Sequence, residues 1–248
     1  MTVLRYLLAA LLAAVLLPIG VLVVSSLFVD TRREYAHSSR FYRSLLYGST
    51  AVVLRLLRIR VHTSGLERIP ADVLPLFVGN HRSNFDPIIE WQVLRAWRPA
   101  FLSKKENFRV PIFGRIIRKC CFMEIDRENP RRAMETINQA AALLRQGEVS
   151  IGVYPEGTRS KSGELLPFHN GVFKIAQKAS APIVVVAIRG TEKIHSQVIL
   201  HRSEVYVDVV DVIFPEQWES ARTSEIGERV RGALLAALSS DAQEPAKN

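Results

Sequence analysis

Short apolar runs alternate with amphipathic stretches along most of the chain, beginning near Val61. The apolar runs, which predict buried strands, are Val73–Val78, Ala100–Ser103, Cys121–Ile125, Val149–Tyr154, Ile183–Ile188 and Glu204–Val212. Helical spacing of apolar residues predicts helices over Pro87–Trp97, Phe113–Arg118, Pro130–Arg145, Gly171–Lys178 and Ser224–Leu238. Because strands alternate with helices, we expect an α/β fold with a central, mostly parallel sheet flanked by helices over residues 61–240.

An uncharged run of 23 residues, Tyr6–Phe28, precedes this region. A helix of this length spans about 35 Å, enough to cross a bilayer. Pro18 and Gly20 leave a kinked span or a re-entrant hairpin open, and a cleaved signal peptide is a further alternative. The run is long for a signal peptide and continues into a basic segment, which favours a membrane anchor. The arginines after it predict a cytoplasmic location for the rest of the chain: Arg32, Arg33, Arg40 and Arg43.

The segment Arg40–Arg60 has the pattern of a basic amphipathic helix. Its apolar stripe, which Leu54 interrupts, consists of Phe41, Leu45, Val52, Leu56 and Ile59, and its basic face of Arg40, Arg43 and Arg58. We expect this helix to lie in the membrane interface with its arginines toward lipid head groups, so that residues 1–60 form a membrane-associated two-helix segment. The alternative is a helix packed on the domain core. The polar residues 241–248 are expected to form a disordered tail.

The net charge of +9 results from 33 Lys and Arg against 24 Asp and Glu. This surplus favours an anionic partner, and the uncharged run makes lipid a better candidate than nucleic acid. Cys120 and Cys121 are adjacent, so they provide neither a disulfide framework nor metal-ligand spacing, and a reducing compartment is expected. The signatures of serine hydrolases, P-loop NTPases, dinucleotide-binding folds and zinc sites are absent from the sequence. We therefore expect neither a metal nor a cofactor.

The strongest candidate for chemistry is the motif N-H-R-S-N-F-D, Asn80–Asp86, directly after a predicted strand. A spacing of five residues does not place His81 and Asp86 on one face of a helix, so it favours a corner between a loop and a helix. Asp86 before Pro87 has the pattern of a helix N-cap. If Asp86 accepts from one ring nitrogen of His81, the other nitrogen is free to act as a general base. A simple helix cap beside an unrelated histidine is the alternative.

Two further loops carry candidate binding residues. In Y-P-E-G-T-R-S, Tyr154–Ser160, Gly157 permits close approach of the backbone, Thr158 offers a hydroxyl, and Arg159 offers a planar guanidinium suited to phosphate. Glu156 would orient the arginine or accept from a substrate hydroxyl, and an ordinary surface turn is the alternative. Of Lys104 and Lys105 we expect one to be solvated and the other to face the site. Residues read as structural or surface groups are His169, His195 and His201.

The motifs, taken in order, resemble the glycerophospholipid acyltransferase family. They are N-H-R-S-N-F-D, K-K-E-N-F-R-V-P-I-F-G, F-M-E-I-D-R, Y-P-E-G-T-R-S and A-P-I-V-V-V, within Val61–His195. The resemblance implies that His81 and Asp86 are the catalytic pair. It also implies that residues 156–159 bind glycerol phosphate, and that Pro182 belongs to an acyl-side block. The departures from the family pattern are Asn107, Cys121 and Val185, at positions where an aliphatic residue, glycine and proline are common; we expect them to affect packing more than chemistry.

The expected function is transfer of a fatty acyl group from acyl-carrier protein or coenzyme A to the sn-2 hydroxyl of 1-acyl-sn-glycerol 3-phosphate. The product would be phosphatidic acid, made at the cytoplasmic face of the inner or plasma membrane. Expected partners are the lysophospholipid, the acyl thioester and membrane lipids. One alternative is another lysolipid acceptor, such as lyso-ornithine lipid. The other is a non-catalytic protein that binds anionic lipids.

Overall fold

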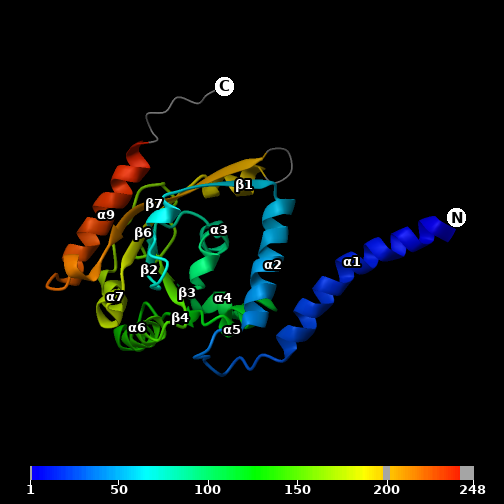
Figure 1. Cartoon of the computed structure of the whole chain (residues 1–248), viewed down its shortest axis with the longest axis horizontal. Helices are drawn as coiled ribbons and strands as arrows, with labels where there is room; N and C mark the ends of the chain where they lie inside the picture. The colour runs from blue at the N-terminus through cyan, green and yellow to red at the C-terminus, as the bar shows by residue number, and fades with distance from the viewer. Residues whose placement is uncertain (1, 198–201, 241–248) are drawn as a thin grey trace.

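The strands of the central sheet combine into one continuous layer. The computed structural model describes residues 2–197 and 202–240, and within these residues the sheet has seven strands in the order β1-β7-β6-β2-β5-β3-β4 (Figure 1). The strands are β1 Ile59–Ser64, β2 Leu76–Gly79, β3 Pro99–Ser103, β4 Met123–Glu124, β5 Ser150–Val153, β6 Ile183–Arg189 and β7 Ser203–Ile213. Only the β6–β7 pair is antiparallel among these neighbours, which confirms the predicted mostly parallel sheet.

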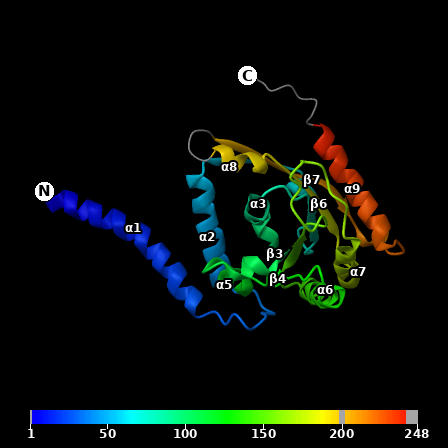
Figure 2. The same cartoon turned by 180° about the vertical axis from the view of Figure 1, so that it is seen from behind.

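Helices cover both faces of the sheet. They are α1 Thr2–Leu27, α2 Arg40–Leu56, α3 Phe85–Val93, α4 Lys105–Arg109, α5 Phe113–Lys119, α6 Pro130–Arg145, α7 Lys174–Ala179, α8 Ile194–Gln197 and α9 Thr223–Ser240. Successive residues of a strand point to opposite faces. Accordingly, Leu76 and Val78 belong to a core shared with α6, α7 and α9, whereas Phe77 packs in a second core with Ile89 and Leu94. Figure 2 shows α9 alongside β6 and β7.

The predicted elements are found with changes at their ends. The helix Pro130–Arg145 has the predicted bounds because the Asn129 side chain caps the backbone N–H groups of its first turn. The strand predicted from Val73 begins only at Leu76, after Pro75, which has no N–H to donate. The predicted helix Arg40–Arg60 ends at Leu56, and residues 59–64 form the edge strand β1 paired with β7. Residues 59 and 60 therefore belong to the sheet.

Helix α2 lies differently from the predicted interfacial helix. Its buried residues are Arg43, Leu46, Thr50 and Leu54, so of the three arginines assigned to lipid head groups only Arg43 contacts the domain, whereas Arg40 and Arg58 are exposed. The Arg43 guanidinium is 5% exposed and donates to the Pro99 and Cys120 carbonyl oxygens. One face of the helix therefore packs on the core, and the interfacial position stays a prediction for the rest of it. The opposite face remains apolar and exposed, with Phe41, Val52, Val53 and Leu56.

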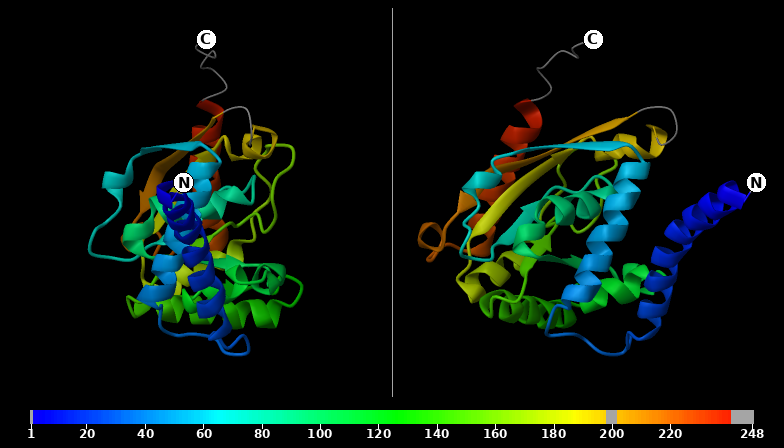
Figure 3. Two further views of the ribbon diagram at one scale, coloured as in Figure 1. Left: turned by 90° about the vertical axis from the view of Figure 1, so that its right-hand side faces the viewer. Right: turned by 45° about the vertical axis from the view of Figure 1, so that its right-hand side comes forward.

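Helix α1 projects away from the sheet, as the two views in Figure 3 show. It is continuous through Pro18, and it is long and apolar enough to cross a membrane. Its C-terminal end contacts the domain: the Ser25 carbonyl accepts from the Tyr42 hydroxyl at 2.8 Å, and the Ser26 carbonyl accepts from Arg115. The predicted tail, residues 241–248, and His201 lie outside the described residues.

Candidate active site

The end of β2 fixes the start of the His81 loop. The Asn80 side chain is 1% exposed and pairs with the backbone of Ile188 on β6. Its amide donates to the Ile188 carbonyl at 2.9 Å, and its oxygen accepts the Ile188 N–H at 2.8 Å. This side chain therefore extends the sheet's hydrogen bonding by one position. His81, the next residue, emerges at the carboxyl edge of the sheet, where α/β proteins commonly bind ligands.

The His81 imidazole and the Asp86 carboxylate form the predicted pair. Asp86 is fully buried, and its Oδ2 lies 2.8 Å from His81 Nδ1. The same oxygen accepts the backbone N–H groups of Arg82 and Ser83 at 2.6 and 2.7 Å, while Oδ1 accepts from the Thr191 hydroxyl at 2.5 Å. An ionised carboxylate only accepts, so His81 Nδ1 carries the proton and Nε2 is free to accept another.

Asp86 is not the N-cap of α3. The N-cap is Asn84, and Asp86 lies within the first turn of the helix. Its carboxylate turns back toward the preceding loop because two backbone N–H groups of that loop converge on it. The predicted cap was wrong, but the loop-to-helix corner inferred from the spacing is present.

His81 lies at a cavity of about 440 Å³ whose lining combines cationic and apolar side chains. The polar lining includes Lys104, Arg127, Thr158, Arg159 and His169. The apolar lining includes Ile88, Trp91, Phe101, Leu102, Phe113, Ile117, Phe122, Ile125 and Val172. A cavity lined by both cationic groups and apolar side chains suits an amphipathic anion.

Glu156 holds two backbone segments together beside this cavity. Its side chain is 3% exposed; Oε1 accepts the His81 N–H at 2.7 Å and Oε2 accepts the Leu166 N–H at 2.9 Å. Burial raises the pKa of this carboxyl, although the two N–H donors oppose that shift. Both oxygens are directed at the backbone, so Glu156 positions the His81 loop. It neither orients Arg159 nor lines the cavity among the described residues.

Gly157 is required by its conformation and by its neighbour. Its φ is +70°, and a Cβ at this position would meet His169 Cδ2 at 2.9 Å. Gly157, Thr158 and Arg159 all line the cavity, and their role in binding stays a prediction. Ser160 then donates its N–H to the His81 carbonyl at 2.8 Å, which attaches this loop to the loop of the base.

The remaining predicted residues divide between the cavity and other places. Lys104 lines the cavity, whereas Lys105 does not. Pro182 precedes β6, at the edge of the parallel strands opposite to His81, and its carbonyl accepts the Leu76 N–H at 2.9 Å. Its position does not bring it to the cavity, so its acyl-side role stays a prediction.

Two residues of the cavity were missed from the sequence. His169, predicted to be a structural or surface residue, lines the cavity beside Gly157. Its spacing from other motifs gives no sign of this, because the two residues meet only when the loop folds. Arg127 is the last residue of the motif F-M-E-I-D-R. This motif contributed to the family resemblance, but no binding or catalytic role was predicted for its residues. Asn107, expected to affect packing, also lines the cavity and donates to the Ser103 hydroxyl at 2.6 Å. Cys121, where glycine is common, has a φ of +62° in the left-handed region that favours glycine.

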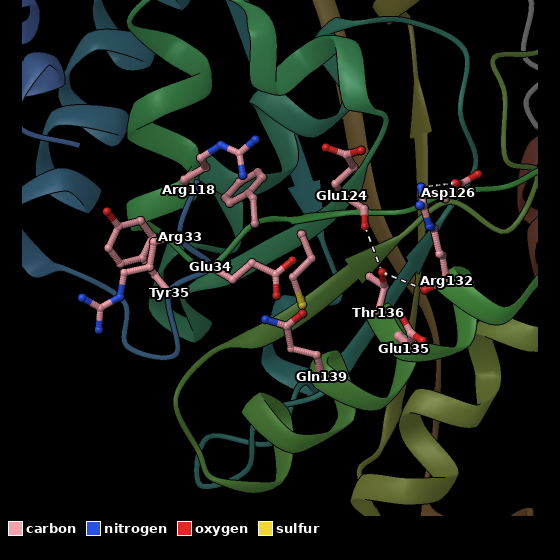
Figure 4. Close-up of a pocket in the computed structure, with 12 residues that line it drawn as sticks. Arg33, Glu34, Tyr35, Arg118, Glu124, Asp126, Arg132, Glu135, Thr136 and Gln139 are labelled. Atoms are coloured by element: carbon pink, nitrogen blue, oxygen red, sulfur yellow. Dashed lines mark hydrogen bonds and ion pairs between the residues drawn. The ribbon is translucent and has the colours of Figure 1, made fainter. Parts of the chain in front are cut away.

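A second cavity of about 540 Å³ lies beyond Phe122, the one described residue that lines both cavities. Figure 4 shows its lining, from the α1–α2 connection and from α5, β4 and α6: Arg33, Glu34, Tyr35, Arg118, Phe122, Met123, Glu124, Asp126, Arg132, Glu135, Thr136 and Gln139. It includes neither His81 nor Asp86. We therefore place the candidate active site in the first cavity. Within the described residues, no group of three or more His, Cys, Asp or Glu side chains is arranged to hold a metal ion.

The fold is that of a solved lipid enzyme. The crystal structure of the 1-acyl-sn-glycerophosphate (LPA) acyltransferase PlsC from Thermotoga maritima matches with a TM-score of 0.70 and 23% sequence identity, covering 100% of both chains. At this identity the match establishes the architecture.

Curated proteins add similarity in sequence. The 1-acyl-sn-glycerol-3-phosphate acyltransferase of Haemophilus influenzae is 31% identical over 153 residues, covering 59% of this chain and 62% of that protein. The Escherichia coli protein of the same name is 28% identical over 159 residues and covers 64% of each. The chloroplastic BAT2 from Brassica napus is 32% identical over 154 residues, covering 60% of this chain and 44% of that protein. The matches thus span about half to two thirds of these relatives.

The acyltransferase family model matches residues 60–189, the segment from β1 to β6 that carries His81, Asp86 and the 156–159 loop. This chain belongs to the acyltransferase family.

Proposed function

We propose that this protein transfers a fatty acyl group from an acyl thioester to the sn-2 hydroxyl of 1-acyl-sn-glycerol 3-phosphate, giving phosphatidic acid in phospholipid biosynthesis. The observation that carries the proposal is the His81–Asp86 pair, with Nδ1 2.8 Å from Oδ2, at a cavity lined by both cationic and apolar side chains. The names of the curated relatives support the same acceptor.

His81 acts as the general base in this proposal. Its Nε2 takes the proton from the acceptor hydroxyl while that oxygen attacks the thioester carbonyl carbon. The tetrahedral intermediate then expels the thiolate, which recovers a proton from the imidazolium, so the ester forms as the C–S bond breaks. Asp86 keeps the ring in the required tautomer and stabilises its positive charge. No protein nucleophile is required.

The cavity lining offers different groups to the two ends of the acceptor. Arg159, with Lys104 and Arg127, offers guanidinium and ammonium donors to the phosphate monoester. The fatty acyl chains lie against the apolar lining residues, which include Trp91 and Phe122. The acyl donor is a fatty acyl group carried on acyl-carrier protein or on coenzyme A. In both donors the carbonyl that is attacked belongs to a thioester.

The N-terminal helices attach the enzyme to its substrate's membrane. Helix α1 has the length and composition of a span, and the exposed face of α2 with Phe41, Val52 and Leu56 continues the apolar surface. Arginines after α1 favour the cytoplasmic side of the inner or plasma membrane for the catalytic domain.

The test is an acceptor series with the purified, detergent-solubilised protein. A long-chain acyl thioester on acyl-carrier protein or on coenzyme A is offered with 1-acyl-sn-glycerol 3-phosphate or lyso-ornithine lipid, and products are identified by mass spectrometry. Phosphatidic acid as the main product supports the proposal. Acylation of lyso-ornithine lipid alone would contradict the proposed acceptor and support the proposed acyl transfer. Binding to anionic vesicles without any acyl transfer contradicts the enzyme and favours a lipid-binding protein.

A further inference from the structure

The buried carboxyl of Glu90 is a group that the proposed reaction does not use. It lies on α3, four residues after Asp86 and therefore on the same face of the helix. Its side chain is 1% exposed; Oε2 accepts the Tyr154 hydroxyl at 3.0 Å, and Oε1 has no hydrogen-bond partner among the described residues. Buried carboxyls are rare in proteins and costly to ionise, so this one calls for a structural or functional reason.

The Tyr154 ring connects Glu90 to the base. It stacks on the His81 imidazole with ring centroids 4.3 Å apart and an interplanar angle of 12°. Its other aromatic neighbour is Phe101, stacked at 5.7 Å and 20°. The hydroxyl end of the ring is held by Glu90, so the ring has little freedom to slide across the imidazole.

Gly79 provides the space for this pair at the end of β2. A Cβ at Gly79 would lie 2.8 Å from Glu90 Oε1 and 3.2 Å from Tyr154 Cε1. Its φ is not in the left-handed region, so this glycine is explained by the close approach of Glu90 and Tyr154. The strand that ends in Asn80 and His81 thus accommodates the pair.

Burial favours the uncharged form of both groups. Burial, and next the nearby charge of Asp86, raise the pKa of Glu90 well above its usual range, although the Tyr154 hydrogen bond opposes this. Burial, followed by Glu90 and Asp86, raises the pKa of Tyr154. In its uncharged form Glu90 would still accept the tyrosine hydroxyl, and it would place no second negative charge beside Asp86.

We propose that Glu90 is a positioning residue, which holds the Tyr154 ring against His81 and so sets the orientation of the base. This inference rests on the proposed function. Asp86 fixes the imidazole within its plane through Nδ1, and Tyr154 restrains it from one face. Without the Glu90 hydrogen bond the ring can shift, and the imidazole can rock away from the line between Nε2 and the acceptor hydroxyl.

The kinetic test uses three substitutions that change one feature each. Tyr154→Phe keeps the stacking and removes the hydroxyl; Glu90→Leu removes the acceptor; Glu90→Gln keeps a neutral acceptor. We expect the first two to lower kcat about tenfold each with an unchanged KM for the acceptor, and Glu90→Gln to recover most of the loss. Because both act through one hydrogen bond, the double variant should lose about as much as either single one. If the double variant instead lost the product of the two single losses in kcat, the coupling of Glu90 and Tyr154 through one hydrogen bond would be overturned. A wild-type kcat in folded Glu90→Leu would overturn it as well.

The pH–rate profile distinguishes positioning from general destabilisation. Since burial favours the uncharged form of Glu90, we expect Glu90→Gln to leave the acidic limb of the kcat/KM profile at the wild-type pH. A displaced limb would show that Glu90 is ionised beside Asp86 and would overturn the neutral pair.

A readout without turnover separates this inference from the proposed function. The His81 ring resonances, assigned by comparison with His81→Ala, report the ring current of the stacked Tyr154. We expect them to shift in Glu90→Leu and in Tyr154→Phe, and to stay near wild type in Glu90→Gln. This holds whether or not the wild type acylates lysophosphatidic acid, so an inactive wild type contradicts only the function. Unmoved resonances in folded Glu90→Leu contradict the positioning role.

Discussion

The backbone N–H of His81 donates to Oε1 of Glu156 over 2.7 Å, and the Leu166 N–H donates to the other oxygen. One buried carboxylate thus connects the loop of the base to the loop of the binding residues, and it does so through the backbone. Glu156→Ala leaves two partly buried donors unpaired, so we expect a loss of about 1–3 kcal/mol in the free energy of unfolding together with a lower kcat. Urea unfolding measures the first effect. The control is Glu164→Ala, at an exposed carboxylate nearby; equal losses in the two variants would contradict the bridging role.

Arg159 lines the cavity and has an exposed side chain, as expected for a group that meets the acceptor phosphate. Charge-assisted hydrogen bonds contribute about 1.5–3 kcal/mol, so Arg159→Ala should raise the KM for 1-acyl-sn-glycerol 3-phosphate roughly 10- to 100-fold with little change in kcat. Steady-state kinetics with varied acceptor measures this. Arg109, which is exposed and outside the cavity, provides the matched Arg109→Ala control. A KM that changes equally in both variants would indicate a general charge effect.

Alanine substitutions at Gly157 and at Gly163 distinguish the effect of backbone strain from that of a steric contact. Both have positive φ values, +70° and +82°, but a Cβ at Gly163 meets open space while a Cβ at Gly157 meets His169. Gly163→Ala should therefore cost about 1 kcal/mol of stability without loss of turnover. Gly157→Ala should cost at least as much and also lower kcat/KM, because His169 must move. Thermal unfolding and kinetics on the two variants test this, and full activity in Gly157→Ala would show that the position of His169 is unimportant.

The buried Glu90 makes stability depend on pH in a defined direction. Its pKa is raised in the folded state, so the native protein binds this proton more tightly than the unfolded chain does. The stabilisation is present at low pH and is lost as pH rises through the window between the unfolded and folded pKa values. Relative to Glu90→Gln, the wild type should lose about 1.4 kcal/mol per pH unit within that window. Urea unfolding of both proteins at pH 5, 6 and 7 measures the difference, and a constant difference would contradict a raised pKa.

The sequence predicted those features that depend on local patterns. The spacing of His81 and Asp86 indicated a loop-to-helix corner, and the structure brings them within 2.8 Å. Asn129 before a proline predicted the start of α6 correctly. The alternation of strands and helices predicted the fold class. The edge strand β1 was not predicted, because only Ile59 and Val61 on one of its faces are partly buried and the strand has no continuous apolar run.

The features that were missed depend on contacts between distant segments. Arg43 has the spacing of an exposed residue on a basic face, but its guanidinium reaches carbonyl oxygens 56 and 77 residues away. Glu156 resembles a ligand-binding residue until its two backbone partners are seen. Nothing in the sequence links Glu90 to Tyr154, 64 residues later. Local patterns do not encode such partners, since each is decided by the topology of the sheet.

The most direct test of the account compares His81→Ala with the wild type in acyl transfer to 1-acyl-sn-glycerol 3-phosphate. A general base contributes about 10²–10⁴-fold, so turnover should fall at least a hundredfold while circular dichroism and the unfolding temperature stay near wild type. His195→Ala, at an exposed histidine outside the cavity, should retain wild-type turnover. A folded His81→Ala protein that keeps more than about a tenth of the wild-type rate would contradict the assignment of His81 as the base.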